Sequence, residues 1–245
     1  MILVEGLRKS FGATHAVDGV SFSARDGQIT ALLGANGAGK TTTLRMLYTL
    51  MRPDAGRILV DGIDAQQDAL AVRRLLGVLP DARGLYRRLT ARENIEYYAA
   101  LQGLSGERAR TRTDELLQTL SMQDIAERRT EGFSQGERLK TALARTLIHD
   151  PRNVLLDEPT NGLDVMSTRS LREFLRRLRD DGRCVLFSTH IMQEVSALCD
   201  HVVIIARGRV VAQGTPDALR EQAGEASLEE AFMKLIGVAA LGELS

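Results

Sequence analysis

The residues GANGAGKT, Gly34 to Thr41, constrain the fold of this chain more than any other stretch. They fit the phosphate-loop pattern GxxxxGK[ST] at every fixed position. An apolar run at 29–33 precedes them, and apolar residues at helical spacing follow them until Arg52-Pro53. This order predicts a buried strand, a phosphate-binding turn and a helix. The alternative is a glycine-rich turn that binds nothing.

The residue types of this loop suit the wrapping of a triphosphate. Gly34, Gly37 and Gly39 let the backbone curl tightly, so that its N–H groups can surround phosphate oxygens. The helix that we expect to begin near Lys40 directs its positive end at the phosphates. The Lys40 ammonium would reach the β- and γ-phosphates, and the Thr41 hydroxyl would bind Mg²⁺. The other loop residues that we expect to contact the nucleotide are Asn36, Ala38 and Thr42.

The balance of charges disfavours a nucleic-acid partner. Lys plus Arg and Asp plus Glu both total 32 among 245 residues, so the formal net charge is zero, and we find no basic stripe. The apolar runs are far shorter than the roughly 20 residues that cross a bilayer, and the N-terminus lacks the architecture of a signal peptide. We therefore expect a soluble, cytosolic chain in which Cys184 and Cys199 are reduced structural thiols.

The flanking segments predict a β-rich layer and an inserted helical region. Short strands are expected at 2–4, 20–22, 57–60 and 77–79, with turns at 10–12 and 25–27 and a helix over 68–76. From Thr90 to about His149 the pattern is helical. Two capping-box sequences, Thr90-x-x-Glu93 and Ser134-x-x-Glu137, each precede apolar residues at helical spacing there.

A second chemical feature is the apolar run 153–156, which is followed by two adjacent carboxylates, Asp157 and Glu158. Neighbouring side chains of a strand point to opposite faces, so the two acids can take different roles. We assign Asp157 to Mg²⁺ and Glu158 to the proton of the water that attacks the γ-phosphate. The alternative is a pair of surface acids, which a phosphate loop in the same chain disfavours.

The C-terminal third supplies a candidate histidine and a helical tail. His190 follows an expected core strand at 184–188, which favours a γ-phosphate contact over a purely structural role. A hairpin around Arg207-Gly208 and a helix that begins at Thr215-Pro216 come next. The core of the domain is expected to end near residue 222. The tail 223–245 is expected to form a helix that docks on its own domain or on its twin.

With these motifs in order, residues 1–222 resemble the nucleotide-binding subunit of ATP-binding cassette (ABC) transporters. The motifs that carry the resemblance are Phe11-Gly12 as adenine-stacking loop, GANGAGKT as Walker A, FSQGE as a variant signature, VLLDEP as Walker B, Gly162 to Asp164 as D-loop, and His190 as switch histidine. The resemblance implies an α/β phosphate-loop ATPase with a mostly parallel core sheet, an N-terminal antiparallel β layer and a helical subdomain inserted at about 84–149. By itself, Phe11 indicates an aromatic ring partly buried under a neighbour.

The resemblance also implies that two cassettes pair head to tail and sandwich two ATP molecules. Ser134 and Gly136 would then complete the shell around the γ-phosphate bound by the partner, and Asp164 is a further candidate contact. The chain departs from the family at two positions. Glu137 replaces the final glutamine of the common signature LSGGQ, and Asp81 stands where a glutamine is usual. We hypothesise that Asp81 couples the nucleotide to the helical region.

The stretch 77–101 resembles a subgroup of export cassettes that includes sodium-extrusion ATPases, in which a separate membrane subunit belongs to the ABC-2 class. Leu85, Tyr86 and Arg87 are candidates for the surface that accepts a coupling helix of that permease. We therefore expect the ATPase of an exporter, a homodimer held at the inner face of the cell membrane, with sodium as one possible cargo. The rivals are a soluble cassette that remodels a ribosomal or DNA complex, and a degenerate cassette that only binds ATP.

Overall fold

A six-stranded sheet forms the centre of the computed structural model, which describes residues 1–81 and 84–241. Its strand order is β10-β9-β3-β8-β7-β6, and all neighbours are parallel except β10 and β9. The strands are β3 (Gln28–Leu33), β6 (Leu76–Leu79), β7 (Asn153–Asp157), β8 (Cys184–Thr189), β9 (His201–Ala206) and β10 (Arg209–Gly214). The predicted mostly parallel core sheet is thereby confirmed.

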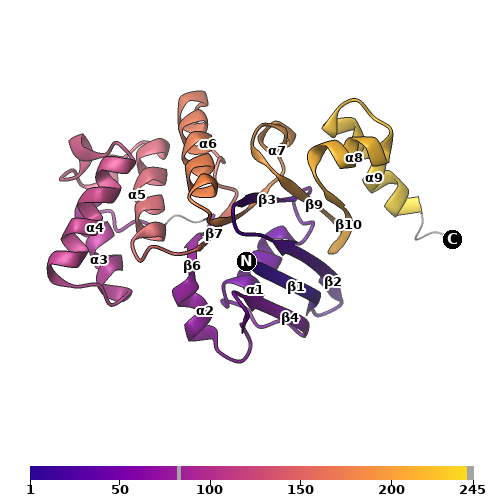
Figure 1. Cartoon of the computed structure of the whole chain (residues 1–245), viewed down its shortest axis with the longest axis horizontal. Coiled ribbons are helices and arrows are strands. Elements are labelled where there is room, and N and C mark those ends of the chain that lie inside the picture. Colours follow the sequence, from indigo (N-terminus) through magenta and orange to yellow (C-terminus); the bar gives the residue numbers. More distant parts are fainter. Residues whose placement is uncertain (82–83, 242–245) are drawn as a thin grey trace.

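A four-stranded antiparallel sheet of order β2-β1-β4-β5 forms a separate layer below the first (Figure 1). Its strands are β1 (Ile2–Phe11), β2 (Thr14–Ala24), β4 (Ala55–Val60) and β5 (Ile63–Asp64). The expected short strands at 2–4 and 20–22 were too short, because β1 and β2 form one long hairpin. The sequence does not indicate the full length of β1, because its outer half contains the successive polar residues Arg8, Lys9 and Ser10, none of which is buried, and so lacks an apolar alternation.

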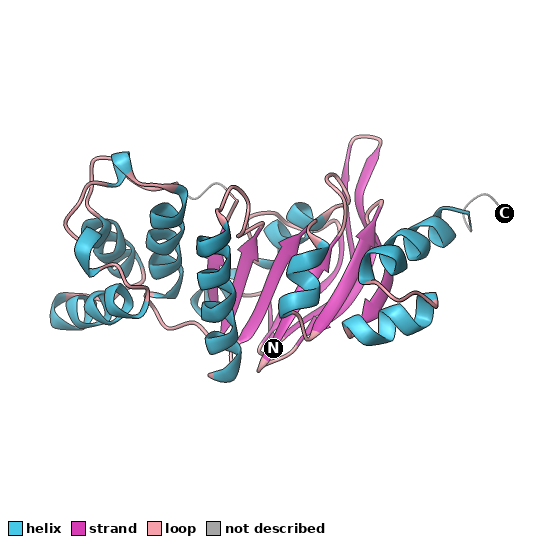
Figure 2. Cartoon of the chain, turned by 90° about the horizontal axis from the view of Figure 1, so that it is seen from above, coloured by secondary structure: helices cyan, strands magenta, loops and turns pink. Residues whose placement is uncertain are grey.

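Helices fill the space between the two sheets and cover the far face of the larger one (Figures 1 and 2). Helix α1 (Lys40–Leu47) packs against β2, β7 and β8. It ends earlier than the predicted limit at Arg52-Pro53, because Thr49 adopts a left-handed φ of 60°. Helix α2 (Ala69–Leu75) leads into β6, while α6 (Val165–Asp180) and α7 (Met192–Leu198) lie on the opposite face.

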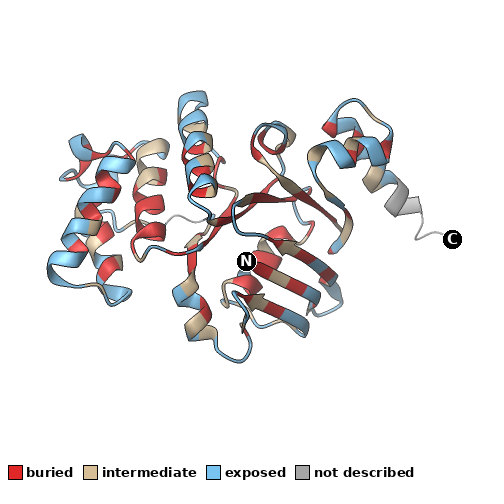
Figure 3. Ribbon diagram, viewed as in Figure 1, coloured by how far each residue is buried: buried red, intermediate tan, exposed pale blue. Residues whose placement is uncertain are grey.

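The alternation of side chains along the parallel strands divides the core in two. On β7, Val154 and Leu156 join the apolar cluster that contains α6, α7 and the helical region. Leu155, which lies between them, joins the cluster around α1 and the antiparallel sheet. Figure 3 accordingly shows the central strands buried throughout. Burial on both faces explains why these strands read as continuous apolar runs in the sequence.

The helical subdomain is inserted between two neighbouring strands of the large sheet, β6 and β7. It comprises α3 (Ala91–Leu101), α4 (Gly106–Thr119), the short 3₁₀ turns η1 (Gln123–Ile125) and η2 (Thr130–Gly132), and α5 (Gln135–Leu147). Both predicted capping boxes are present, at Thr90 with Glu93 and at Ser134 with Glu137. These caps fix where α3 and α5 begin.

Asn94, which the sequence analysis did not single out, fixes the loop that precedes α3. Its side chain is fully buried. The Oδ1 atom accepts from the N–H of Tyr86 at 2.9 Å, and Nδ2 donates to the carbonyls of Tyr86 at 3.1 Å and Thr90 at 2.9 Å. Thr130 adds a hydroxyl bond to the Tyr86 carbonyl at 3.0 Å. The loop is therefore held from two directions.

Replacing Asn94 by alanine is expected to lower the free energy of unfolding by about 2–4 kcal/mol, because several backbone groups would lose their buried partner. Chemical denaturation measures this loss. Gln118→Ala, which removes an exposed amide from α4, is the matched control and should shift stability by less than about 0.5 kcal/mol. Equal effects of the two substitutions would show that Asn94 does not hold the loop.

The C-terminal segment packs on the same domain. Helix α8 (Pro216–Ala223) begins at the predicted cap Thr215, and α9 (Leu228–Leu241) contacts α8, β10 and α7. Leu228 and Phe232 of α9 belong to the main apolar cluster, which extends past the expected limit near residue 222. Of the predicted tail, residues 242–245 lie outside the described residues. Within the described ranges, no helix combines the length and apolar character of a membrane span.

Candidate functional site

The carboxyl ends of β3, β7 and β8 lie together at one edge of the parallel sheet and position the predicted motifs. The phosphate loop follows β3, the two carboxylates follow β7, and His190 follows β8. Two glycines of the loop are required by close backbone contacts. A Cβ on Gly34 would lie 2.3 Å from the carbonyl oxygen of Ile205, and one on Gly39, whose φ is 106°, would lie 2.5 Å from that of Ala16.

Lys40 is almost fully buried, with only 5% of its side chain exposed. Its Nζ donates to the carbonyls of Gly34 at 2.8 Å and Ala35 at 3.2 Å, and lies 3.2 Å from Glu158 Oε1. An ammonium held at the start of α1 adds its charge to the positive end of that helix. The loop therefore presents a concentrated positive charge suited to phosphate oxygens.

Asp157 and Thr41 bring two oxygen donors together. Thr41 Oγ1 lies 3.2 Å from Asp157 Oδ1, which also accepts from the hydroxyl of Ser188 at 2.6 Å. Burial raises the pKa of Asp157 despite these hydrogen bonds. A hydroxyl beside a carboxylate is a donor set that Mg²⁺ prefers, because this ion takes oxygen ligands and usually keeps only one or two protein groups.

Glu158 is held between Lys40 and His190. Its backbone has a left-handed φ of 47°, and its N–H donates to Ser188 Oγ at 3.0 Å. Glu158 follows directly after the last residue of β7, Asp157. Glu158 Oε1 faces Lys40, while Oε2 accepts from His190 Nδ1 at 2.9 Å. Ser188 thus contacts both acidic residues, a role that only its position at the end of β8 could have indicated.

Lys40, Thr41, Glu158 and His190 line a pocket of about 300 Å³, whereas the predicted residues Gly34, Ala38 and Asp157 are not among its lining residues. Its predicted lining residues are Asn36, Gly37, Gly39, Lys40, Thr41, Thr42, Asp81, Glu158 and His190. Ala16 and Asn161 also line it and were not predicted. The glycine cradle, the buried ammonium and the paired oxygen donors fit the triphosphate of ATP with Mg²⁺. Lys40 would hold the phosphates, and Thr41 and Asp157 would hold the ion.

The remaining predicted residues lie outside this pocket. Phe11 is at the end of β1, half exposed, with the Lys9 ammonium 5.9 Å from its ring centre. Ser134 caps α5. Asp164 caps α6 by accepting from the N–H and hydroxyl of Ser167. A Cβ on Gly136 would lie 2.6 Å from that same hydroxyl, so the signature and the D-loop meet at Ser167.

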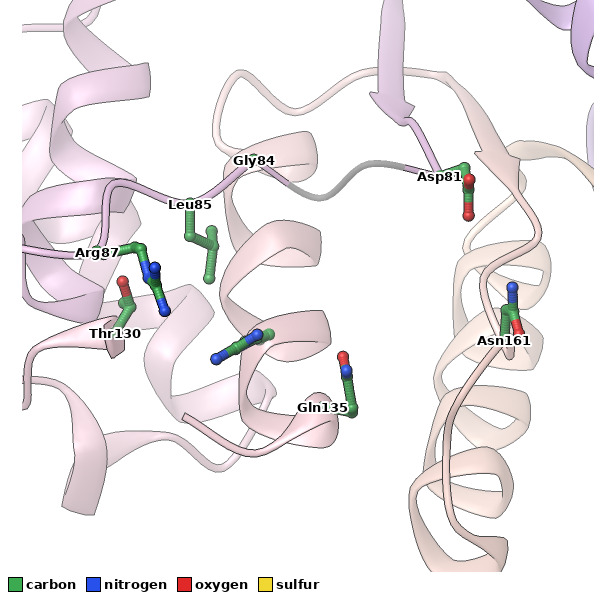
Figure 4. A pocket seen from close by; sticks show the side chains of 8 residues that line it. Asp81, Gly84, Leu85, Arg87, Thr130, Gln135 and Asn161 are labelled. Atoms are coloured by element: carbon green, nitrogen blue, oxygen red, sulfur yellow. The ribbon is translucent and has the colours of Figure 1, made fainter. Parts of the chain in front are cut away.

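A second pocket, of about 330 Å³, shares Asp81 and Asn161 with the first and extends toward the helical subdomain (Figure 4). Its other lining residues are Gly84, Leu85, Arg87, Thr130, Gln135 and Arg138. Asp81 therefore lies at the boundary between the phosphate loop and the start of α5. Ala82 and Arg83, which complete the predicted stretch 77–101, lie outside the described residues.

Comparison with known proteins gives concordant matches. The family described as ABC transporter matches residues 17–161, more than half of the chain. The ABC transporter ATP-binding protein NatA of Bacillus subtilis is 44% identical over 219 residues, which cover 89% of each chain. The Nod factor export ATP-binding protein I of Ralstonia nicotianae is 41% identical over 219 residues, 89% of this chain and 68% of that protein.

A solved structure has the same fold as this chain and contains two copies of its own cassette. The dimeric structure of an ATP-binding cassette in a post-hydrolysis state, bound to ADP and Pi, superposes with a TM-score of 0.79. It is 25% identical in sequence, and the match covers 88% of this chain and 98% of that one. The similarity therefore extends over most of the fold described above.

Proposed function

The chain belongs to the ABC transporter family, and from that premise we propose that it drives an exporter through a separate membrane permease of the ABC-2 class. Family membership makes it an ATP-binding, ATP-hydrolysing subunit. The observation that carries the proposal is the pocket in which Lys40, Glu158 and His190 converge beside a second pocket that reaches the helical subdomain. A relative named for Nod factor export supports export as the direction of transport.

We assign the roles within the pocket by chemistry and distance. Lys40 binds the β- and γ-phosphates, and Thr41 and Asp157 hold Mg²⁺, which would neutralise phosphate charge when bound. Glu158 accepts the proton of the attacking water. His190, hydrogen-bonded to Glu158, orients that carboxylate and contacts the γ-phosphate. Phe11 stacks on the adenine.

Two copies share each nucleotide in this proposal. Ser134 and Gly136 do not line the pocket that contains Lys40 in their own chain. A cassette that matches this chain is a dimer bound to ADP and Pi. We infer that the signature of one copy closes over the γ-phosphate of the other, and that Asp164 lies at the same interface. Hydrolysis would then reopen the dimer.

The permease would dock on the loop that contains Leu85, Tyr86 and Arg87. Leu85 and Arg87 line the second pocket, and the ring of Tyr86, which is 47% exposed, packs edge-on against Tyr97 at 5.1 Å. An exposed aromatic ring beside a cation is typical of protein interfaces. Through such a contact the chain would be held at the inner face of the cell membrane.

Replacing Asp81 by alanine is expected to lower ATP-driven transport about fivefold or more, because Asp81 lines both the nucleotide pocket and the docking pocket. Reconstituted transport and the accompanying ATPase rate measure the effect. Asp68→Ala, which removes the exposed cap of α2, is the control, because Asp68 lines neither pocket. Unchanged transport and ATPase activity in Asp81→Ala would remove Asp81 from the coupling route.

Capture of the native complex tests the proposed function. The Glu158→Gln chain, loaded with ATP in its own cells, should co-purify from solubilised membranes with a polytopic membrane protein in stoichiometric amount. Mass spectrometry identifies that protein, and its class indicates the cargo. Recovery of ribosomal proteins, DNA or soluble partners alone would overturn the exporter and leave the ATPase chemistry intact.

A further inference from the structure

We propose that Arg128 is a positioning residue for the signature, because it neutralises the carboxylate that Glu137 places beside Ser134. The proposal rests on the proposed function, in which Ser134 and Gly136 meet the γ-phosphate bound by a second copy. A cassette with glutamine at this position has no such charge to offset. The acidic signature FSQGE therefore needs a cation to pair with its carboxylate, whereas the common signature LSGGQ carries no charge that needs one.

The carboxylate is fixed close to the groups that would contact phosphate. Glu137 Oε2 accepts from the N–H of Ser134 at 2.7 Å, and Ser134 Oγ accepts from the N–H of Glu137 at 3.2 Å. This reciprocal cap allows Glu137 little freedom to turn away from Ser134. Glutamine could accept the same backbone bond through its amide oxygen, so the cap alone does not require a charge.

The charge is present at neutral pH. Burial acts to raise the pKa of Glu137, but its hydrogen bonds with Ser134 and the charge of Arg128 outweigh burial and lower that pKa. An ionised carboxylate repels a triphosphate, and the repulsion grows as water leaves the interface between two copies. Without a compensating positive charge, the Glu137 carboxylate would therefore oppose the closure of the two copies around the nucleotide.

Arg128 is positioned to offset this charge. Its Nη1 lies 2.9 Å from Glu137 Oε1, and its guanidinium lies 5.4 Å from the ring centre of Phe133, the first signature residue. Arg128 therefore contacts both ends of the signature from outside α5. Arg138, which follows Glu137, instead donates to the carbonyl of Glu131 at 3.4 Å. The Arg128–Glu137 pair leaves the signature neutral where it would approach phosphate.

A rescue experiment tests this role, with ATP-driven dimerisation of the Glu158→Gln chain as the readout. Arg128→Ala should weaken the dimer about tenfold, since a charge opposed to phosphate is uncovered. Adding Glu137→Gln should restore the dimer to within about twofold of Glu137→Gln alone. The defect of Arg128→Ala should also shrink at high salt, because screening weakens the repulsion. If Arg128 had a purely structural role, Glu137→Gln would not restore the dimer and high salt would not reduce the defect.

Arg57→Ala is the matched control, because Arg57 is also 53% exposed and also pairs with a less exposed carboxylate, that of Asp64 on the antiparallel sheet. It should dimerise like the parent. Dimerisation of Arg128→Ala at parental strength would overturn the proposal, and so would a double variant as weak as Arg128→Ala. If the parent Glu158→Gln chain formed no dimer with ATP, the shared nucleotide site of the proposed function would fail, and this proposal with it.

Discussion

Replacing Glu158 by glutamine is expected to lower the ATPase rate by about 10² to 10⁴ while ATP binding persists. Glutamine keeps the shape of the side chain but cannot accept the proton of the attacking water. The residues that hold phosphate and Mg²⁺ in our assignment, Lys40, Thr41 and Asp157, are untouched. Phosphate release measures the rate, and equilibrium binding of ATP measures the affinity.

The matched control for this change is Glu225→Gln, which alters a glutamate that pairs with Lys234 within the C-terminal tail. It should hydrolyse ATP like the parent chain. Turnover of Glu158→Gln near the parental rate would show that the general base is another group. Loss of ATP binding in Glu158→Gln would show instead that Glu158 contributes mainly through its contact with Lys40.

Replacing Lys40 by alanine is expected to weaken ATP binding by about 100-fold or more. The Lys40 ammonium is the buried cation of the loop, and charge-assisted hydrogen bonds are each worth about 1.5–3 kcal/mol. The variant also leaves Glu158 without its cationic partner at the pocket wall. Both changes make the site more negative where a triphosphate must enter. Fluorescent-nucleotide titration measures the affinity.

Lys234→Ala serves as the control, because Lys234 is half exposed and pairs only with a surface glutamate in the contacts described for it. It should bind ATP like the parent. If Lys40→Ala bound ATP within a fewfold of the parent, the phosphates would be held by other groups and the assignment of this pocket would be wrong. A melting-temperature measurement separates loss of binding from loss of folding.

The sequence was most informative where chemistry and local structure use the same residues. The phosphate loop predicted the strand before it and the helix from Lys40, and both are confirmed. Capping boxes predicted the starts of α3 and α5, because all the residues of a capping box lie within four consecutive positions of the sequence. The end of α1 was missed, since Thr49 gives no sequence signal for a left-handed backbone.

Contacts between distant segments could not be read from the chain. Lys40, Glu158 and His190 are far apart in sequence, and only the parallel register of β3, β8 and β7 brings them together. Ser188 contacts both Asp157 and Glu158. Its place at the end of the apolar run 184–188 predicts only a core strand. Asn94 could have been noticed, because a polar residue on the apolar face of a helix usually has a specific partner.

Cross-linking between two copies tests the shared nucleotide site most directly. One copy carries Asn36→Cys in the phosphate loop and the other carries Gln135→Cys in the signature, both in the Glu158→Gln background. The native thiols should be inert, because burial raises the pKa of Cys184 to about 12 and that of Cys199 well above its usual value. A covalent dimer that forms only when both variants are mixed then joins loop to signature.

We expect a short thiol cross-linker to give a covalent dimer when ATP is present. It should give none without ATP, and none when Lys40→Ala is added to both copies. Such a dimer would place the signature of one copy over the nucleotide of the other. Failure to cross-link with ATP, or equal cross-linking without it, would show that the two copies do not share a nucleotide site in this way.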